Sequence, residues 1–467
     1  MCGICGQFRF DGENVSPKSL TSMMSKLARR GPDSKGKWLE GKIGFGHQRL
    51  SIIDLSSHGN QPMVDDLLKL TLVFNGTIYN YKSLRSQLIG KGYSFSSHSD
   101  TEVIIKAYHY WGEDCVKYFD GMFAFCMWDK SNQKLFIARD RIGIKPLYYN
   151  LSNKAFTFAS NSQALLTQEL DKSVNPIALQ QQLSLHGVVP APNTVINGIQ
   201  KVKPATVITI NTKGLLKEKT YWFPSANRSE RNLSDEDYIE KAHELLTKAV
   251  TKRMAAADVP IGVLLSGGLD SSLLVALLKE TSHEDIRTFS IGFEDIDNEA
   301  GSEFEYSDQI VSKFKTQHQK YVVSNAEVLP RLSEAVMNMA EPMVAQDAVA
   351  FYLLSEQVSK HIKVVLSGQG ADEAFAGYFW YPRMAKEKGD EIERFSKHYV
   401  DRPHEEYLQA VMPTYQGDNH TSNWLNKEFA KMRADSFIDK VFRTDITKLI
   451  VDDPVKRVDN MTMAWGL

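Results

Sequence analysis

Short apolar segments separated by turn residues run through the first half of the chain. The segments with the composition of β-strands are residues 7–10, 43–53, 70–79, 122–128, 134–138, 156–158 and 206–210. Turn residues such as Asp11-Gly12 stand between them, and two stretches, residues 20–29 and 101–111, are predicted to be helices. This half is therefore predicted to be an α+β domain of layered antiparallel sheets with helices packed outside.

Strands and helices alternate along the second half instead. A polar connector at residues 225–237 precedes a predicted helix at residues 238–255. The predicted order after it is strand 261–265, helix 271–279, strand 288–292, helix 306–314, strand 319–323, helix 348–359 and strand 364–366. Such alternation predicts an α/β domain with a doubly wound parallel sheet. We place the domain boundary near residue 225, which divides residues 1–225 from residues 226–467.

Composition and charge exclude several classes of protein. The chain of 467 residues carries 55 Lys and Arg against 57 Asp and Glu, so nothing favours nucleic acid or an anionic membrane as partner. No apolar stretch approaches the roughly 20 residues of a membrane-spanning helix, and the start of the chain lacks the pattern of a secretory signal. A cytoplasmic protein is expected, with free thiols at Cys2, Cys5, Cys115 and Cys126. Their spacing favours neither a four-ligand zinc site nor a thioredoxin-like dithiol.

A glycine pair follows the first strand of the second half, within residues 263–272, Val-Leu-Leu-Ser-Gly-Gly-Leu-Asp-Ser-Ser. Glycines let backbone N–H groups approach a phosphate, and the hydroxyls of Ser266, Ser271 and Ser272 can donate hydrogen bonds. The string lacks the lysine of a Walker A loop, which argues against a kinase. A plain turn followed by a helix cap is the alternative interpretation of any single residue here. The whole string after an apolar strand favours a phosphate-binding loop.

The string Ser-Gly-Gly-Leu-Asp-Ser resembles the loop of the ATP pyrophosphatases, which cleave ATP to AMP and pyrophosphate while adenylating an oxygen of their substrate. A second string at residues 366–373, Leu-Ser-Gly-Gln-Gly-Ala-Asp-Glu, resembles that family's second loop for pyrophosphate and magnesium. The resemblance implies ATP and Mg²⁺ as cofactors, with Asp270 and Asp372 as the metal ligands. The residues alone explain Asp372 and Glu373 equally well as solvated acids at a helix start. The implied ATP-binding residues are Leu265, Ser266, Gly267, Gly268, Asp270, Ser271, Ser272, Ile291, Ser367 and Gly368.

The first half begins Met1-Cys2, and this order has a chemical consequence. Once Met1 is removed, Cys2 carries both a thiol and a free α-amine, which can act as the base for its own nucleophile. An N-terminal cysteine alone is weak evidence. The strings at residues 2–6, 30–33, 46–50, 74–80 and 99–102 strengthen it, since together they resemble the class II glutamine amidotransferases, which are N-terminal nucleophile hydrolases.

This resemblance assigns a role to each residue of a glutaminase site. Cys2 would attack the side-chain amide of glutamine, and the Asn75 side chain with the Gly76 N–H would form the oxyanion hole. Arg49 would hold the glutamine carboxylate bidentately, and Asp100 would hold its ammonium. Simpler interpretations remain open: a surface ion pair for Arg49 and a hairpin turn for Asn75-Gly76.

Joined in one chain, the two halves resemble the asparagine synthetase family from Cys2 to the last residue. The resemblance implies a carbon-nitrogen ligase whose partners are glutamine, ATP and a small carboxylate acceptor, and it is compatible with a homodimer. Three residues depart from the pattern of asparagine synthetase itself: Thr77 and Gln369 each replace a usual Glu, and Ala371 replaces a usual Ser or Gly. A Glu at position 369 could accept a proton from incoming ammonia, whereas a neutral amide cannot.

The acceptor is the open question. With residues 186–192, 303–308 and 451–460, the chain looks most like the branch that amidates N-acetylglutaminylglutamine, a bacterial compatible solute. The alternative is aspartate, as in asparagine synthetase. A phosphoribosyl-transferring amidotransferase is disfavoured because its acid-rich phosphoribosyl pyrophosphate loop is not visible.

The chain ends at residues 464–467, where family members continue with E-A-R-x-P-F-L-D and a lysine that helps to hold pyrophosphate. It therefore looks like a C-terminally truncated member. We expect an intact glutaminase half and impaired synthesis, so glutaminase or nucleotide binding alone is the second alternative.

Overall fold

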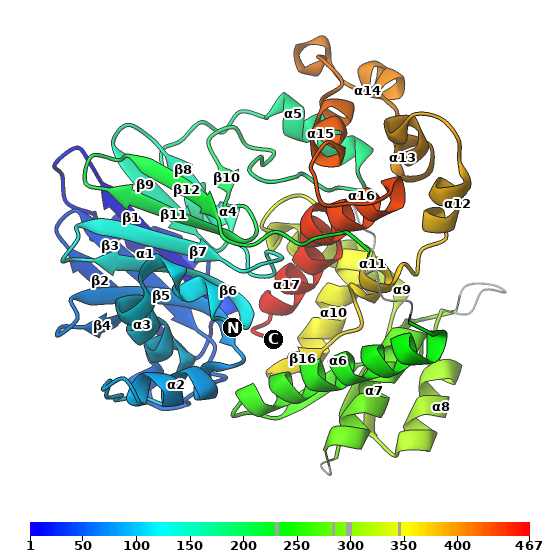
Figure 1. Ribbon diagram of the computed structural model, residues 1–467, viewed down its shortest axis with the longest axis horizontal. Coiled ribbons are helices and arrows are strands. Elements are labelled where there is room, and N and C mark those ends of the chain that lie inside the picture. Colours follow the sequence, from blue (N-terminus) through cyan, green and yellow to red (C-terminus); the bar gives the residue numbers. More distant parts are fainter. Residues whose placement is uncertain (229–232, 283–284, 296–300, 344–346) are drawn as a thin grey trace.

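The computed structural model describes residues 1–228, 233–282, 285–295, 301–343 and 347–467 (Figure 1). Residues 229–232 of the predicted connector lie outside this described part. No helix among the described residues is long and apolar enough to cross a membrane. The four cysteines are all buried and free.

Two six-stranded antiparallel sheets form the first half. The first sheet has the order β10-β8-β9-β1-β3-β2 and the second the order β12-β11-β7-β6-β5-β4. The strands of the first sheet are β1 (Gly3–Arg9), β2 (Ser34–Glu40), β3 (Ile43–Arg49), β8 (Tyr148–Leu151), β9 (Ala155–Ala159) and β10 (Gln200–Lys201). Those of the second are β4 (Met63–Asp65), β5 (Leu70–Ile78), β6 (Gly121–Asp129), β7 (Lys134–Arg139), β11 (Thr206–Asn211) and β12 (Leu216–Thr220). Figure 1 shows the two sheets stacked as layers.

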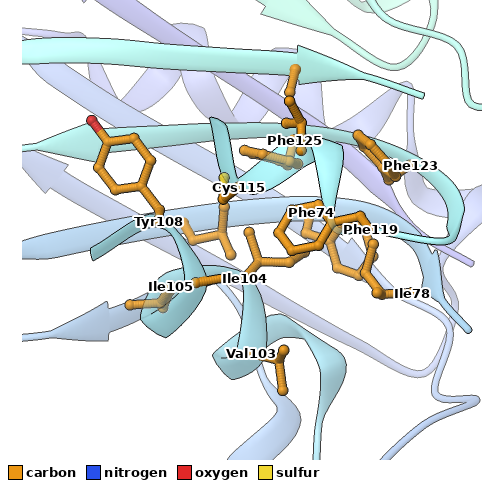
Figure 2. Packing of buried hydrophobic residues seen from close by; sticks show 14 of the residues in the cluster. Phe74, Ile78, Val103, Ile104, Ile105, Tyr108, Cys115, Phe119, Phe123 and Phe125 are labelled. Atoms are coloured by element: carbon orange, nitrogen blue, oxygen red, sulfur yellow. The ribbon is translucent and has the colours of Figure 1, made fainter. Parts of the chain in front are cut away.

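Apolar side chains fill the space between these sheets and cover their outer faces. Phe8 and Phe45 of the first sheet lie in one buried cluster with Val73 of the second. The helices of this half are α1 (Pro17–Ser25), α2 (Tyr81–Ile89), α3 (Asp100–Trp111), α4 (Ser162–Leu165) and α5 (Pro176–Ser184). Figure 2 shows Ile104 of α3 packed toward Phe74 of β5, in the cluster that joins this helix to the second sheet. Each fully buried side chain of this size contributes about 1.5–3 kcal/mol. The predicted layered α+β fold is confirmed.

The second half is built on a parallel sheet with the strand order β15-β14-β13-β16. Its strands are β13 (Ile261–Leu264), β14 (Arg287–Phe293), β15 (Gln317–Val323) and β16 (Val364–Leu366). One face is covered by α6 (Asp235–Ala256), α7 (Leu269–Thr281) and α8 (Phe304–Phe314), the other by α9 (Asn325–Met337), α10 (Asp347–Ser359) and α17 (Lys456–Met463). The predicted doubly wound α/β fold is thus confirmed as well.

The strand order places a topological switch at β13. The chain leaves β13 toward β14 and β15, and later returns to β16 on the opposite side of β13. Because β13 and β16 are parallel neighbours, the loops after both strands emerge at the same edge of the sheet. Ligands of open α/β sheets bind at this kind of crevice.

A set of short helices follows β16 and precedes α17 in the chain. They are α11 (Ala371–Phe375), α12 (Trp380–Lys386), α13 (Glu391–Tyr399), α14 (His404–Ala410), α15 (His420–Phe429) and α16 (Phe437–Thr444). Leu185 and Val188, which follow α5 in the first half, belong to the same buried cluster as Phe395 and Leu425 of these helices. The two halves therefore share a hydrophobic contact.

Candidate active sites

Cys2 lies at the start of β1 with 8% of its surface exposed. Its backbone N–H donates to Oδ1 of Asn75 at 2.9 Å, and its Sγ lies 3.9 Å from the carbonyl oxygen of Leu50. Met1 precedes it here, so this nitrogen is an amide and stands in for the α-amine that removal of Met1 would free. Burial lowers the pKa of the Met1 ammonium to about 5, although the Cys2 thiolate opposes this shift. An α-amine freed on Cys2 would lie in the same buried surroundings, and burial disfavours the charged form of an amine.

Asn75 and Gly76 lie on β5, where they supply two directed donors. Asn75 is fully buried, its Oδ1 is engaged by Cys2, and its Nδ2 has no hydrogen-bond partner within the described part of the chain. A buried donor without an acceptor costs about 1–3 kcal/mol, which an oxyanion could recover. Gly76 has φ of +155°, and a Cβ there would lie 2.2 Å from the carbonyl oxygen of Met122 on β6. Only glycine fits this close approach of two strands.

Arg49 ends β3 and is held rigidly by oxygen atoms of the neighbouring loop. Its Nη1 donates to the Ser56 carbonyl and to Asn60 Oδ1, both at 2.8 Å, and its Nη2 donates to the carbonyls of Ile53 and Asp54. The predicted bidentate contact with a glutamine carboxylate would have to exchange one of these bonds.

Asp100 begins α3 and is 4% exposed. It accepts a hydrogen bond from the Ile78 N–H at 3.0 Å, and burial raises its pKa to about 7. The ionised form of a buried carboxyl group is costly, and it becomes favourable when a substrate ammonium pairs with it.

These residues surround one small cavity. Cys2, Arg49, Gly76 and Asp100 line it together with Met1 and Thr77, and its volume is about 30 Å³. The structure therefore brings the predicted glutaminase residues together, with Asn75 joined to them through its bond to Cys2. Since Met1 lines the same space, its removal would enlarge the cavity.

A buried ion cluster beside this cavity was not singled out from the sequence. Arg30 donates its Nε to the carbonyl oxygen of Cys2 at 3.3 Å, and its Nη1 lies 2.9 Å from Asp459 of α17. Lys145 reaches the other oxygen of Asp459 at 2.8 Å. Burial alone would raise the pKa of Asp459, but Arg30 and Lys145 outweigh it and hold the pKa at about 2. The cluster ties the glutaminase site to the second half.

A larger cavity of about 510 Å³ lies at the switch point of the second half. Eight of the ten predicted ATP-binding residues line it: Leu265, Ser266, Gly268, Asp270, Ser271, Ile291, Ser367 and Gly368. Gly267 and Ser272 are not among the residues that line it. Gly267 turns toward α8, where a Cβ would lie 2.5 Å from the Ser307 nitrogen, and the Ser272 hydroxyl is buried.

Hydroxyl groups of the first loop hold it in shape. Ser266 Oγ lies 3.1 Å from Ser271 Oγ and accepts from the Gly268 N–H at 3.3 Å. The second loop packs directly on the first, because a Cβ on Gly368 would lie 2.8 Å from Cβ of Asp270. Both loops thus pack together at the start of α7, and this arrangement is a suitable cradle for phosphates.

Two carboxylates share this cavity, and they repel each other. Burial raises the pKa of Asp270, and the charge of Asp372 raises it further. A divalent cation would relieve this repulsion. The described residues contain no group of three or more His, Cys, Asp or Glu that could hold a metal alone. The pair therefore fits Mg²⁺ only in the manner usual for that ion, in which phosphates and water complete the coordination.

The neutral Gln369 also lines the cavity, and its side chain contacts Arg457 of α17. Nη2 of Arg457 lies 3.4 Å from its Oε1, and Arg457 also pairs with Asp453 at 3.0 Å. Nearby, the Tyr378 hydroxyl donates to Glu373 at 2.8 Å, while burial raises the pKa of this glutamate. The sequence alone explained Glu373 equally well as a solvated acid. In the structure this side chain is buried, so that interpretation is wrong for Glu373.

Two family models match the chain, one in each half. Residues 1–222 match the glutamine amidotransferase domain, and residues 241–467 match asparagine synthase. Among curated relatives, the asparagine synthetase (glutamine-hydrolysing) 1 of Bacillus subtilis is 36% identical over 384 residues, which cover 82% of this chain and 59% of that protein. The asparagine synthetase (glutamine-hydrolysing) 3 of the same organism is 31% identical over 452 residues, covering 93% of this chain and 71% of that protein.

The chain thus spans 59% of the length of the first of these relatives and 71% of the second. Each matched region contains all the residues that line one of the two cavities. The chain belongs to the asparagine synthetase family.

Proposed function

We propose that this protein is a glutamine-hydrolysing, ATP-dependent amidotransferase, with a glutaminase half at residues 1–225 and a synthetase half at residues 226–467. The observation that carries the proposal is the presence of two separate cavities, one around Cys2 and one between the two glycine-rich loops. Each cavity has the donors and charges that its half of the reaction needs.

In the first half-reaction, the freed α-amine of Cys2 takes the thiol proton and Sγ attacks the side-chain carbonyl carbon of glutamine. The developing oxyanion accepts hydrogen bonds from Nδ2 of Asn75 and the N–H of Gly76. The carbon–nitrogen bond breaks, ammonia leaves with the proton returned by the amine, and a thioester remains. Water then hydrolyses the thioester to glutamate and restores the thiol. The orphaned Nδ2 of Asn75 supports this role.

In the second half-reaction, an acceptor carboxylate attacks the α-phosphorus of ATP and pyrophosphate leaves. Ammonia then attacks the acyl-adenylate, and the amide and AMP are released. Loop residues 266–271 would hold the phosphates, while Asp270 and Asp372 would hold Mg²⁺, which neutralises phosphate charge when bound. The close contact between the two loops supports this assignment.

For the acceptor we propose N-acetylglutaminylglutamine, with aspartate as the alternative. Gln369 supports the dipeptide, since the neutral amide departs from the glutamate usual in asparagine synthetase and is already engaged by Arg457. The names of the two relatives support aspartate.

Pyrophosphate release separates these possibilities. The protein is incubated with ATP, Mg²⁺ and glutamine, with either N-acetylglutaminylglutamine or aspartate, and glutamate formation is recorded in parallel. Release that depends on the dipeptide supports the proposal, whereas release that depends only on aspartate replaces the acceptor. Glutamate formation without pyrophosphate release with either acceptor would favour the second alternative, glutaminase activity alone.

A further inference from the structure

A third cavity, of about 800 Å³, lies between the two halves and apart from both candidate active sites. One wall comes from Lys203 before β11 and from the connector after β12, which includes Trp222. The opposite wall comes from residues 431–433 after α15 and from Lys448 after α16. The residues that line it do not line the other two cavities. Its volume is in the range of small-molecule sites.

The lining of this cavity is strongly positive. Five cations, Arg141, Lys203, Lys431, Arg433 and Lys448, face one acid, Glu428. Lys203 pairs with Glu218 at 2.7 Å and Lys431 pairs with Glu428. Among the described residues, Arg141, Arg433 and Lys448 form no salt bridge, although the charge of Glu428 partly offsets that of Lys448. An anion could compensate these three charges.

The three uncompensated cations differ in how they are held. In the part of the chain that the structure describes, Arg141 donates only to backbone carbonyls, those of Phe119 at 2.6 Å and Lys117 at 3.1 Å. Within the described ranges, the side chains of Arg433 and Lys448 have no hydrogen-bond or ion-pair partner. Lys448 is half-buried, and burial lowers its pKa. Bringing an anion to it would reverse that penalty.

A planar apolar surface completes the lining. Trp222 is half-buried, and within the described residues its ring contacts no other aromatic ring and no cation. An indole face of this kind can stack on a flat heterocycle, which contributes about 1–3 kcal/mol per base.

Hydrogen bonds within the protein hold the walls of this cavity. Arg443 donates to the carbonyls of Met432 at 2.7 Å, and of Glu428 and Lys431 at 3.1 Å. The connector is tied to the same segment, since Ala226 pairs with Ala434. Figure 1 shows this connector, drawn in green, running from β12 past α16. These contacts fix the two walls relative to each other, so the cavity is part of the folded structure.

We propose that this cavity is a second nucleotide site, in which Lys448, Arg433 and Arg141 bind the phosphate and Trp222 stacks on the base. It is distinct from the ATP site proposed at residues 266–271. Because its walls come from both halves, an occupant stabilises their contact and couples them.

Calorimetric titration with AMP tests this proposal on the full chain. Wild-type protein is expected to bind AMP at two sites, and Lys448→Met to lose one of them or weaken it at least tenfold, the scale of one charge-assisted hydrogen bond. Lys18→Met, which removes an exposed lysine on α1, is the matched control and should bind as the wild type does. Glutamine hydrolysis should be unchanged in both variants. Equal stoichiometry and affinity for wild type and Lys448→Met would overturn the proposal.

A second variant separates the two sites. In Gly368→Val the added side chain would crowd Asp270 and block the cavity between the loops, so one AMP should still bind and should be lost in the double variant with Lys448→Met. Binding of no AMP by a folded Gly368→Val protein would overturn the second site. Titration with inorganic phosphate tests whether the base of AMP contributes to binding. Phosphate should bind the cavity at Lys448 more weakly than AMP does, and equal affinity would overturn the assignment to a nucleotide.

Discussion

Arg30 and Asp459 form a buried ion pair at 2.9 Å although 429 residues separate them in the chain. Arg30 also contacts the Cys2 carbonyl, so this pair connects α17 of the second half to the proposed nucleophile. Lys145 completes the cluster on the other oxygen of Asp459. The carboxylate is the one group that both cations share.

Asp459→Asn should therefore destabilise the protein. The substitution keeps the shape but leaves two buried cations without a charge partner, which costs about 3–5 kcal/mol. A lowered urea midpoint at pH 7 checks this, with the exposed Asp171→Asn as control. If the midpoints of both variants equal that of the wild type, the cluster does not hold the halves together.

The same carboxylate predicts a pH dependence. Its pKa is about 2 in the folded protein against an ordinary value of 3.8, so its contribution of about 2 kcal/mol is complete above about pH 4 and is lost as the pH falls toward 2. The difference in urea midpoint between wild type and Asp459→Asn should shrink over that interval. A difference that stays constant from pH 7 to about pH 2.5 would count against this assignment.

Asn75→Ala should lower the rate of glutamine hydrolysis by about 10²–10³-fold, because it removes one oxyanion donor. The KM for glutamine should change little, since the bond matters most in the transition state. Steady-state kinetics of glutamate formation measure both. Asn150→Ala removes a partly buried amide of the same half and should retain activity. An unaltered rate in Asn75→Ala would leave Asn75 with a structural role within β5 only.

The buried Asp100 should set a pH limit on glutamine use. Burial raises its pKa to about 7, and only the ionised form can pair with the ammonium of glutamine. We expect kcat/KM to rise with pH and to level off above about pH 7, as it reports groups of the free enzyme. Asp100→Asn should lower kcat/KM and lack this limb. A profile of Asp100→Asn that parallels the wild type would assign the limb to another group.

Asp372→Asn should raise the Mg²⁺ concentration needed for half-maximal pyrophosphate release by about tenfold or more, since it removes one of two carboxylate ligands. Glutamine hydrolysis should be spared because the first cavity is separate. The exposed Asp285→Asn serves as control in the same half. Equal loss of both activities in Asp372→Asn would indicate misfolding or strong coupling, and would count against a local metal role.

Much of the fold could be predicted because its strands are buried and apolar. The predicted strand at residues 70–79 agrees with β5, and that at 288–292 agrees with β14. Five strands of the first half were missed: β2, β4, β8, β10 and β12. All but β8 lie at sheet edges, and β12 is largely charged, as in Lys217-Glu218-Lys219. Edge strands of this composition give a weak sequence signal. The short helices α11 to α16 were not predicted, because their packing depends on distant residues such as Leu185.

The candidate sites divide in the same way. Cys2, Asn75 and Gly76 could be singled out from the sequence because each stands in a short motif that resembles the class II glutamine amidotransferases, and the structure brings them together. Lys145 and Asp459 could not, because their roles depend on a contact across 314 residues. Arg30 and Asp459 both stand within quoted strings, residues 30–33 and 451–460, yet only the fold shows that Arg30 touches Cys2 and pairs with Asp459.

The rate of glutamate formation from glutamine tests the central claim most directly, when it is measured on protein whose N-terminus is established by intact mass. Protein that begins at Cys2 should hydrolyse glutamine. Protein that retains Met1, and Cys2→Ala protein, should fall to the uncatalysed rate, because the first lacks the free amine and the second lacks the thiol. Hydrolysis that persists in Cys2→Ala, or that is unaffected by retained Met1, would contradict an N-terminal cysteine nucleophile in this protein.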